Sequence, residues 1–193
     1  MNLEILYTAL YSYILGSIPF GLILTKFFSN KDLRKIGSGN IGATNVLRTG
    51  KKILGTLTLL LDVMKSYAAV IITYRYFTDY IYLSALLCLL GHVFPIWLKF
   101  KGGKGIAAFL GILFALSINF GITFIVCWSL ILYITKYSSI SSLASTGVIF
   151  LYSIYLNSSF ESMFFFIIFI IVIYSHRENI ARLKNKTENK INL

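Results

Sequence analysis

A glycine-rich segment in the first quarter of the chain combines small residues with groups that bind anions. Gly37, Gly39 and Gly42 have the spacing GxGxxG, but a dinucleotide site needs a preceding strand, and an apolar membrane-type stretch precedes these glycines. Glycines still let backbone N–H groups approach an anion, while Ser38 adds a hydroxyl and Arg48 a positive charge. The segment predicts a phosphate-binding loop; a flexible loop with a basic patch at the lipid surface is the alternative. Its further candidate substrate-binding residues are Asn40, Ala43, Thr44 and Asn45.

A second glycine-rich segment reads Lys-Phe-Lys-Gly-Gly-Lys-Gly over residues 99–105 and directly precedes a stretch of helical character. It is not a P-loop, because that motif has a Ser or Thr directly after its Lys. Gly102, Gly103 and Lys104 nevertheless combine amides that we expect to be unpaired at a helix start with a mobile positive charge. These features suit a phosphate. Lysines that only set the membrane topology would explain the charge but not the glycines.

A third polar segment, around residues 174–183, follows the last apolar stretch. His176, Asn179 and Leu183 share one face of a predicted helix, because residues three and four apart are neighbours on a helix. A lone histidine at an interface is more often structural than catalytic. Its placement beside Asn179 and basic residues makes His176 a candidate for catalysis or for orienting a substrate.

Two further polar pairs lie inside apolar stretches. Asp62 and Lys65 are three residues apart, which allows an ion pair on one helix face, and His92 and Pro95 lie near the end of another stretch. Ionisable residues within a membrane are functional candidates by default. A mutual pair with a structural role is the simpler interpretation of Asp62 and Lys65.

The composition indicates whether the elements that position these segments lie in water or in a lipid bilayer. The chain has 193 residues, of which 57% are hydrophobic and 13% charged, whereas a soluble domain carries about 25% charged residues. Disorder is excluded by the abundance of Phe and Tyr. The chain is therefore predicted to be an all-α integral membrane protein, with its first apolar stretch retained as a span. Cys88 and Cys127 lie in apolar runs without partners at metal-ligand spacing, so we expect no disulfide and no metal site.

Charge distribution predicts the topology of the spans. The fourth apolar stretch, residues 106–135, would form a helix of about 45 Å, which exceeds the bilayer core of about 30 Å, and Ser117, Asn119 and Gly121 offer a turn that divides it. Seven spans with the N-terminus outside place every basic residue except Lys65 and Arg75 inside, as the positive-inside bias favours. The predicted fold is seven transmembrane helices with a cytoplasmic C-terminus, forming a single domain over residues 1–193. The apolar stretches are residues 3–25, 53–74, 80–98, 106–135, 139–156 and 160–175.

Four separated motifs together resemble the bacterial PlsY-type glycerol-3-phosphate acyltransferases. They cover nearly the whole chain in the family's order, which makes the resemblance specific, although each motif alone would be weak. The motifs are Gly-Ser-Ile-Pro-Phe-Gly at 16–21, Gly-Ser-Gly-Asn-Ile-Gly-Ala-Thr-Asn at 37–45, Gly-His-Val-Phe-Pro at 91–95 with Phe-Lys-Gly-Gly-Lys-Gly at 100–105, and His-Arg-Glu-Asn-Ile at 176–180.

The resemblance implies a bacterial inner-membrane enzyme of phospholipid biosynthesis with its active site on the cytoplasmic face. Its substrates would be acyl phosphate and glycerol 3-phosphate, and its products would be lysophosphatidic acid and phosphate. Neither acyl-CoA nor acyl carrier protein would be the acyl donor. Membrane lipid and the enzyme that makes acyl phosphate are the candidate partners, and no nucleic acid is expected. Residues that match catalytic positions are Ser38, Arg48, Lys104, His176 and Asn179. Ser139 and Ser142 match a family segment in which Lys136 and Ser138 depart from the usual Arg and Val.

The chemistry of an acyl phosphate predicts direct attack by the glycerol hydroxyl. The donor is a mixed anhydride with phosphate as its leaving group, so no covalent acyl-enzyme is required, and Ser38 has no evident carboxylate to complete a triad with His176. A phosphate oxygen of the donor could accept the hydroxyl proton, while Arg48 and Lys104 hold phosphates and stabilise the departing charge. Without paired carboxylates on the inner side, we expect neither a magnesium site nor a cofactor.

Three other functions were weighed. A transporter of small anions or phospholipids would typically show internal repeats and a site near the bilayer midplane, and no convincing repeat is present. An acyl-CoA acyltransferase with a His-x4-Asp pair is disfavoured because Trp97 follows His92 and Ala181 follows His176 at the Asp position. A scaffold without catalytic activity would tolerate the loss of Arg48 and Lys104.

Overall fold

The computed structural model describes residues 3–156 and 159–191, and in these ranges all regular elements are helical. The all-helical prediction is therefore confirmed. Contacts within the chain define two compact units, Met1–Leu116 and Ser117–Leu193.

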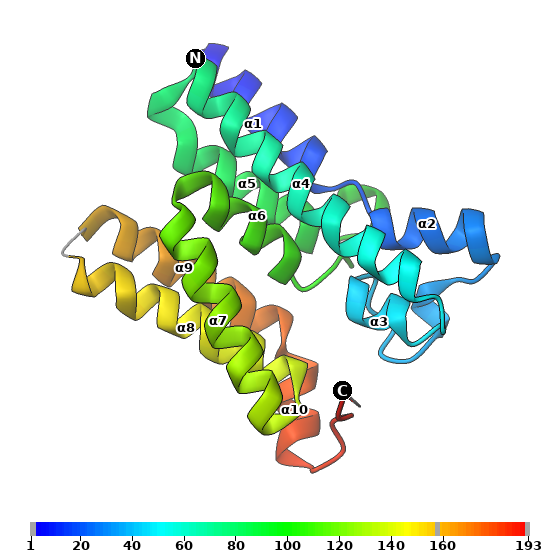
Figure 1. Cartoon of the computed structure of the whole chain (residues 1–193). Coiled ribbons are helices and arrows are strands. Elements are labelled where there is room, and N and C mark those ends of the chain that lie inside the picture. Colours follow the sequence, from blue (N-terminus) through cyan, green and yellow to red (C-terminus); the bar gives the residue numbers. More distant parts are fainter. Residues whose placement is uncertain (1–2, 157–158, 192–193) are drawn as a thin grey trace. The chain divides into compact units, whose positions relative to one another are not determined.

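The first unit is built on four apolar helices that lie side by side (Figure 1). Helix α4 packs against α1, α5 and α6, and α1 also packs along α5. The helices of this unit are α1 (Leu3–Gly16), α2 (Phe20–Ser29), α3 (Ala43–Leu47), α4 (Lys52–Tyr76), α5 (Ile81–Val93) and α6 (Ile106–Leu116), with 3-10 turns η1 (Leu33–Lys35), η2 (Thr78–Tyr80) and η3 (Ile96–Leu98).

Two glycines make the close helix crossings of this unit. A Cβ atom at Gly111 on α6 would lie 2.1 Å from the carbonyl oxygen of Val63 on α4. A Cβ at Gly16 would lie 2.0 Å from the carbonyl oxygen of Cys88 on α5. Small residues at such crossings let helix backbones approach, which replaces the hydrophobic driving force that lipid does not supply.

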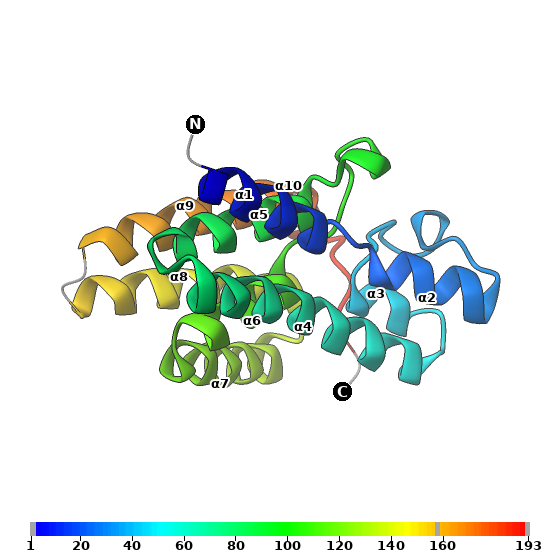
Figure 2. The same cartoon turned by 90° about the horizontal axis from the view of Figure 1, so that it is seen from above.

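A break at Ser17–Pro19 separates α1 from α2, so the first apolar stretch forms two helices. Pro19 has no N–H to continue the helical ladder. The indole N–H of Trp97 donates to the Ser17 carbonyl at 2.8 Å, and the Lys65 ammonium donates to the Ile18 carbonyl at 2.7 Å. Beyond the break, α2 leads to the glycine-rich segment, which lies with α3 beside the start of α4 (Figure 2).

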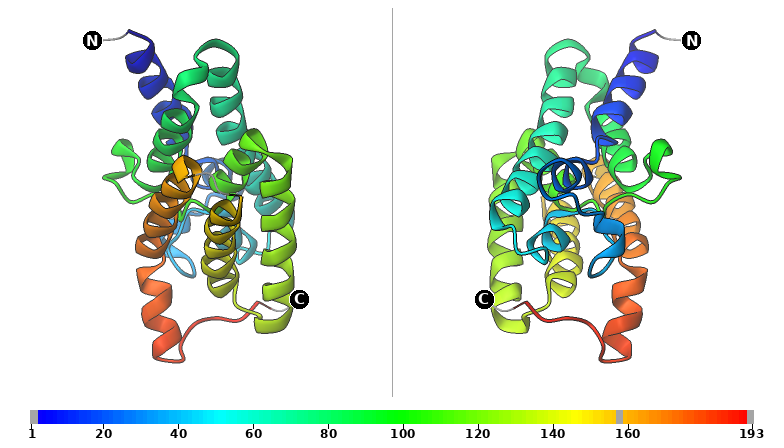
Figure 3. Two further views of the ribbon diagram at one scale, coloured as in Figure 1. Left: turned by 90° about the vertical axis from the view of Figure 1, so that its left-hand side faces the viewer. Right: turned by 90° about the vertical axis from the view of Figure 1, so that its right-hand side faces the viewer.

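The second unit consists of α7 (Ile118–Thr135), α8 (Ser138–Tyr155), α9 (Ser159–Ser175) and α10 (Arg177–Lys184). Helix α8 packs against both α7 and α9, and α10 continues from α9 after a bend of 59° (Figure 3). Aromatic rings join α7 to α8 and α9, with Phe120 5.5 Å from Tyr152 and 4.9 Å from Phe165 between ring centroids. Edge-on aromatic pairs of this kind add to the packing energy of buried rings.

The division of the long apolar stretch at residues 106–135 is confirmed. Helix α6 ends at Leu116 and α7 begins at Ile118. Ser117 caps the new helix, since its hydroxyl accepts a hydrogen bond from the Asn119 N–H at 3.3 Å. A Ser cap satisfies one of the N–H groups that a helix start leaves without a helical partner.

By length and composition, four helical segments in the described part of the chain could cross a membrane, or five if the bent pair α9 and α10 counts as one span. Helix α6, with 11 residues, is shorter than a full span. The seven-span topology and the sidedness of the termini stay predictions. The four segments are Leu3–Ser29, Lys52–Tyr76, Thr78–Leu98 and Ile118–Thr135.

The glycine crossings lead to a test with two matched substitutions. Gly111→Ala forces α6 away from the α4 backbone, and we expect it to destabilise the protein by about 1–3 kcal/mol. Gly147→Ala on α8 places its Cβ 3.5 Å from the Phe169 ring, an ordinary contact, and should gain up to about 1 kcal/mol from helix propensity. Thermal unfolding in detergent measures both effects. Equal effects of the two substitutions would contradict the close α4–α6 crossing.

Candidate active site

The glycine-rich segment of the first unit folds around one amide side chain, that of Asn45. This side chain is 2% exposed, and its Nδ2 group donates to the carbonyls of Leu33, Ile36 and Asn40 at 3.2, 2.9 and 2.7 Å. Its Oδ1 accepts from the N–H of Ser38 at 3.2 Å. Asn45 was predicted to bind substrate, whereas its polar atoms in the structure bind the loop itself. The residue holds the loop in shape.

Two glycines with positive φ bring Arg48 against the turn that carries Ser38. Gly37 has φ 55° and Gly39 has φ 69°, values that favour glycine. A Cβ at Gly37 would lie 2.4 Å from Asn45 Oδ1 and 3.0 Å from Cδ of Arg48. The structure thus places the Arg48 side chain against Gly37, which precedes Ser38 in the chain.

The remaining predicted residues of this loop have different roles. Asn40 accepts a hydrogen bond from the Gly42 N–H at 2.8 Å, which closes the turn before α3. Thr44 is exposed, and Ala43 is half-buried as the first residue of α3. The sequence argument assigned these residues together to substrate binding, but Asn40 and Gly42 bind each other.

The basic residues near this loop differ in how their charge is compensated. Arg34 pairs with Asp32 at 2.8 Å, and its hydrogen bonds lower the pKa of Asp32 to about 2. Arg48 is exposed and forms no ion pair with any described residue. Arg48 is therefore better placed than Arg34 to bind an added anion.

The second glycine-rich segment is hydrogen-bonded to the end of α5. The N–H groups of Gly102 and Gly103 donate to the carbonyls of Val93 and His92 at 3.1 and 3.0 Å. A Cβ at Gly103 would lie 2.1 Å from Nε2 of His92, so the glycine packs on the ring. The expectation of unpaired amides is wrong for these two glycines, because their donors already have carbonyl partners. They set the position of Lys104, which is half-buried just before α6.

The predicted ion pair of Asp62 and Lys65 is confirmed. Lys65 Nζ lies 2.7 Å from Asp62 Oδ1, and both side chains are 3% exposed. The Nδ1 atom of His92 lies 3.7 Å from the same carboxylate oxygen.

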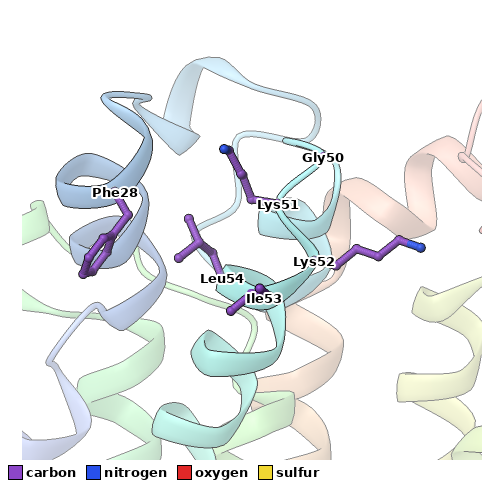
Figure 4. Close-up of a pocket in the computed structure, with 6 residues that line it drawn as sticks. All are labelled: Phe28, Gly50, Lys51, Lys52, Ile53 and Leu54. Carbon is purple, nitrogen blue, oxygen red and sulfur yellow. The ribbon is translucent and has the colours of Figure 1, made fainter.

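A surface hollow of about 350 Å³ lies between the end of α2 and the start of α4 (Figure 4). It does not include the predicted catalytic residues. Figure 4 shows Lys51 beside the hollow, whereas Lys52 extends away from Phe28. Its lining residues are Phe28, Gly50, Lys51, Lys52, Ile53 and Leu54.

In the second unit, His176 lies at the bend between α9 and α10 and is 2% exposed. Its Nδ1 lies 2.9 Å from the carbonyl of Val172 and 3.2 Å from the Ser175 hydroxyl. A carbonyl oxygen only accepts, so Nδ1 carries a proton and donates it to the Val172 carbonyl. This bond fixes the orientation of the ring.

Asn179 shares its surroundings with a carboxylate that the sequence argument did not find. Glu188 Oε1 accepts from Asn179 Nδ2 at 2.5 Å and from the Ser139 hydroxyl at 2.8 Å. Its Oε2 accepts from Arg182 Nε at 2.7 Å. Partial burial would raise the pKa of Glu188, but the hydrogen bonds from Asn179, Arg182 and Ser139 outweigh it and lower the pKa. The sequence did contain one signal for Glu188, which is the single acidic residue after Lys184 and lies between Lys186 and Lys190.

Ser142 has a separate role. Its hydroxyl accepts from the indole N–H of Trp128 at 3.1 Å and donates to the Ser138 carbonyl at 2.8 Å. These contacts join α7 to α8. The structure thus brings Ser139 and Asn179 together through Glu188. The Ser142 hydroxyl instead takes part in the packing of α7 on α8.

Among the described residues, no group of three or more His, Cys, Asp or Glu side chains could hold a metal ion.

Comparison with known proteins decides the family. A family model described as glycerol-3-phosphate acyltransferase matches residues 6–186. The chain belongs to the glycerol-3-phosphate acyltransferase family. The resemblance to this family that the four motifs indicated is confirmed.

Relatives and solved structures agree with this family. The glycerol-3-phosphate acyltransferase of Pelagibacter ubique is 54% identical, with 97% of this chain and 98% of that protein covered. That of Mesorhizobium japonicum is 44% identical over 99% and 98% of the two chains. A crystal structure of PlsY (YgiH), an integral membrane glycerol 3-phosphate acyltransferase, in its glycerol 3-phosphate form has a TM-score of 0.92 and 34% identity, and covers 97% of this chain and 96% of that one. The lysophosphatidic acid form has a TM-score of 0.89 and 33% identity over 97% and 95% of the chains.

The role of Asn45 can be tested separately from catalysis. Asn45→Ala removes one donor from each of three loop carbonyls and the acceptor of the Ser38 N–H, and a buried group left without a partner costs about 1–3 kcal/mol. We expect faster amide hydrogen exchange in residues 33–50 and loss of acyltransferase activity. Thr44→Ala, at the exposed neighbouring position, is the control and should leave the exchange unchanged. Unchanged exchange in the Asn45 variant would contradict its role in shaping the loop.

The lowered pKa of Glu188 leads to a pH-dependent prediction. When the pKa of a carboxyl group is lower in the folded state than in the unfolded state, the group stabilises the fold at pH values above its unfolded pKa of about 4.3. This contribution is lost as the pH falls through the pKa of the folded state. Glu188→Gln should therefore lower the unfolding temperature at pH 7, and the difference from wild type should shrink at an acidic pH below this unfolded pKa. Glu178→Gln, whose ion pair with Arg182 is long at 3.9 Å, is the matched control. A difference that is the same at both pH values would exclude this charge effect.

Proposed function

We propose that this glycerol-3-phosphate acyltransferase takes its acyl group from acyl phosphate and transfers it to the 1-hydroxyl of glycerol 3-phosphate. The products would be lysophosphatidic acid and inorganic phosphate. Family membership supports acylation of glycerol 3-phosphate, and the similar PlsY structures are described in forms with glycerol 3-phosphate and with lysophosphatidic acid. The observation that carries the proposal is the loop folded on Asn45, in which the Ser38 N–H bonds to Asn45 and Arg48 packs on Gly37.

In the first unit, Arg48 and Lys104 bind phosphate groups. Each side chain extends from a loop whose backbone is fixed by internal hydrogen bonds, so the charges are preorganised. Ser38 contributes its hydroxyl as a neutral ligand. Gly37, Gly39 and Gly103 assist by permitting the turns and the close packing on which these positions depend.

In the second unit, His176 and Asn179 orient glycerol 3-phosphate. The Nδ1–H bond to Val172 fixes the ring in one orientation, so that the imidazole can orient the bound substrate. The carboxylate of Glu188 binds Asn179 and Ser139 and fixes the amide. In this proposal the whole chain, residues 1–193, is one acyltransferase domain.

The reaction proceeds by direct attack without an acyl-enzyme. The glycerol oxygen bonds to the carbonyl carbon of the acyl phosphate, the bond from that carbon to the phosphate oxygen breaks, and the hydroxyl proton passes to a phosphate oxygen. Glu188 is engaged by Asn179, Ser139 and Arg182, which argues against its use as the third member of a catalytic triad. Arg48 and Lys104 stabilise the charge of the departing phosphate, and the mechanism uses neither metal nor cofactor.

The protein acts in a bacterial inner membrane with its site on the cytoplasmic side. The proposed topology of seven spans with the N-terminus outside places the basic residues near both glycine-rich segments on this face. Acyl phosphate enters from the lipid, and the enzyme that makes acyl phosphate is the candidate partner for its delivery.

A donor comparison tests the proposed activity. Purified protein is incubated with labelled glycerol 3-phosphate and either palmitoyl phosphate, palmitoyl-CoA or palmitoyl-acyl carrier protein. We expect lysophosphatidic acid from palmitoyl phosphate alone, and no labelled acyl group on Ser38 when the donor carries the label. Product from palmitoyl-CoA alone would refute the donor, and an acyl group trapped on Ser38 would refute direct attack.

Variants in the same assay show whether the two basic residues bind the substrates. Arg48→Ala and Lys104→Met should each lower activity by about 10²-fold, because preorganised donors to developing charge contribute on this scale. Arg75→Ala, an exposed position near the end of α4, is the matched control and should keep full activity. Full activity of both Arg48 and Lys104 variants would favour a scaffold over an enzyme that uses these loops.

A further inference from the structure

Three buried ionisable side chains of the first unit take no part in the proposed reaction. As whole residues, Asp62, Lys65 and His92 are 2%, 6% and 6% exposed. They meet at the Asp62 carboxylate, which lies 2.7 Å from Lys65 Nζ and 3.7 Å from His92 Nδ1. Burying such groups is expensive, and an apolar pair of similar volume often serves stability as well or better. Their presence therefore needs a reason other than stability.

One side of this cluster holds the break between α1 and α2. The ammonium of Lys65 donates to the carbonyl of Ile18 at 2.7 Å and lies 5.6 Å from the centre of the Phe20 ring. The preceding carbonyl, that of Ser17, accepts from Trp97 Nε1 at 2.8 Å. Apolar surroundings offer no water for backbone groups at a helix break, so these side chains fix where the break occurs.

The break in turn positions the loop that carries Arg48. Two residues after Pro19, the α2 residue Gly21 packs so closely on the glycine-rich loop that a Cβ there would lie 2.0 Å from the Ile41 carbonyl oxygen. A shift of α2 would therefore displace this loop.

The other side of the cluster supports the segment that carries Lys104. Gly103 packs on the His92 ring, and its N–H donates to the His92 carbonyl at 3.0 Å. Trp97 belongs to the turn η3 just before this segment. Trp97, which binds the break, thus lies just before Lys99–Gly102, and His92 of the cluster contacts Gly103 just after it.

We propose that Asp62, Lys65 and His92 are positioning residues for the phosphate site, which align the two glycine-rich loops on glycerol 3-phosphate. The proposal rests on the proposed function, in which Arg48 and Lys104 bind that substrate. Asp62 holds the Lys65 ammonium on the Ile18 carbonyl and lies beside His92, and the His92 ring supports Gly103. A purely structural ion pair would affect stability alone, whereas a positioning network affects the affinity for substrate.

The test separates these two roles with a double substitution that removes both charges. Asp62→Leu combined with Lys65→Met leaves no unpaired buried charge but removes the donor to the Ile18 carbonyl. Full-length protein is assayed for KM and kcat with palmitoyl phosphate, and for its unfolding temperature with and without glycerol 3-phosphate. We expect an unfolding temperature near that of wild type, a KM for glycerol 3-phosphate raised about tenfold, and kcat within about threefold of wild type. Stabilisation by glycerol 3-phosphate should weaken accordingly.

A milder substitution tests the same proposal if the double variant does not fold. Trp97→Phe removes only the indole N–H bonded to Ser17, from a side chain that is 51% exposed. We expect a KM raised about threefold or more with an unchanged unfolding temperature. Thr58→Val is the matched control on α4, because its buried hydroxyl bonds only to Leu54 within the helix, and it should leave KM unchanged.

The outcomes separate this proposal from the proposed function. If the wild type is active but the folded double variant, or the Trp97→Phe variant, has an unchanged KM for glycerol 3-phosphate, the positioning role alone is overturned. A wild type that makes no lysophosphatidic acid and is not stabilised by glycerol 3-phosphate would overturn the proposed function and this inference with it. Lys65→Arg keeps the charge and the donors. A KM for this variant that lies closer to the wild-type value than the KM of the double variant would support the positioning role.

Discussion

The structure depends on one constraint, the need of every backbone polar group in apolar surroundings for a partner within the protein. Regular helices meet this need by themselves, but each break in a helix must be satisfied by side chains. At the first break Lys65 and Trp97 bind the carbonyls of Ile18 and Ser17. At the bend after α9, the ring of His176 binds the carbonyl of Val172. Lys65 and His176, to which the proposals assign positioning and orienting roles, lie at these breaks, because a break is where a polar side chain can be held rigidly inside an apolar protein.

The glycine-rich loops illustrate how such rigidity is obtained. Both loops use most of their own hydrogen-bonding groups internally, through Asn45 in one and through the carbonyls of His92 and Val93 in the other. Each loop carries one of the two basic residues of the proposed phosphate site, Arg48 or Lys104. The glycines serve close packing and tight turns.

Much of this arrangement was predictable from local patterns in the sequence. Hydropathy located the helices, Ser117 marked the division of the long apolar stretch, and the spacing of Asp62 and Lys65 predicted their ion pair. The site was less predictable, because its organising contacts join residues far apart in the chain. Glu188 binds Ser139 across 49 positions, and nothing near either residue in the sequence signals the contact. The internal use of the Asn45, Gly102 and Gly103 groups was likewise hidden, since a motif shows which groups are present but not which are already bonded.

The tail after α10 also has a practical consequence for work with this enzyme. The backbone N–H of Ile191 donates to the carbonyl of Lys136 at 2.8 Å, and the ammonium of Lys190 lies 5.6 Å from the centre of the Tyr137 ring. Together with Glu188, these contacts tie the tail to the turn between α7 and α8. An affinity tag or fluorescent fusion joined directly to this tail would compete with these contacts and disturb the surroundings of Asn179. Attachment through a flexible spacer, or at the other terminus, preserves them.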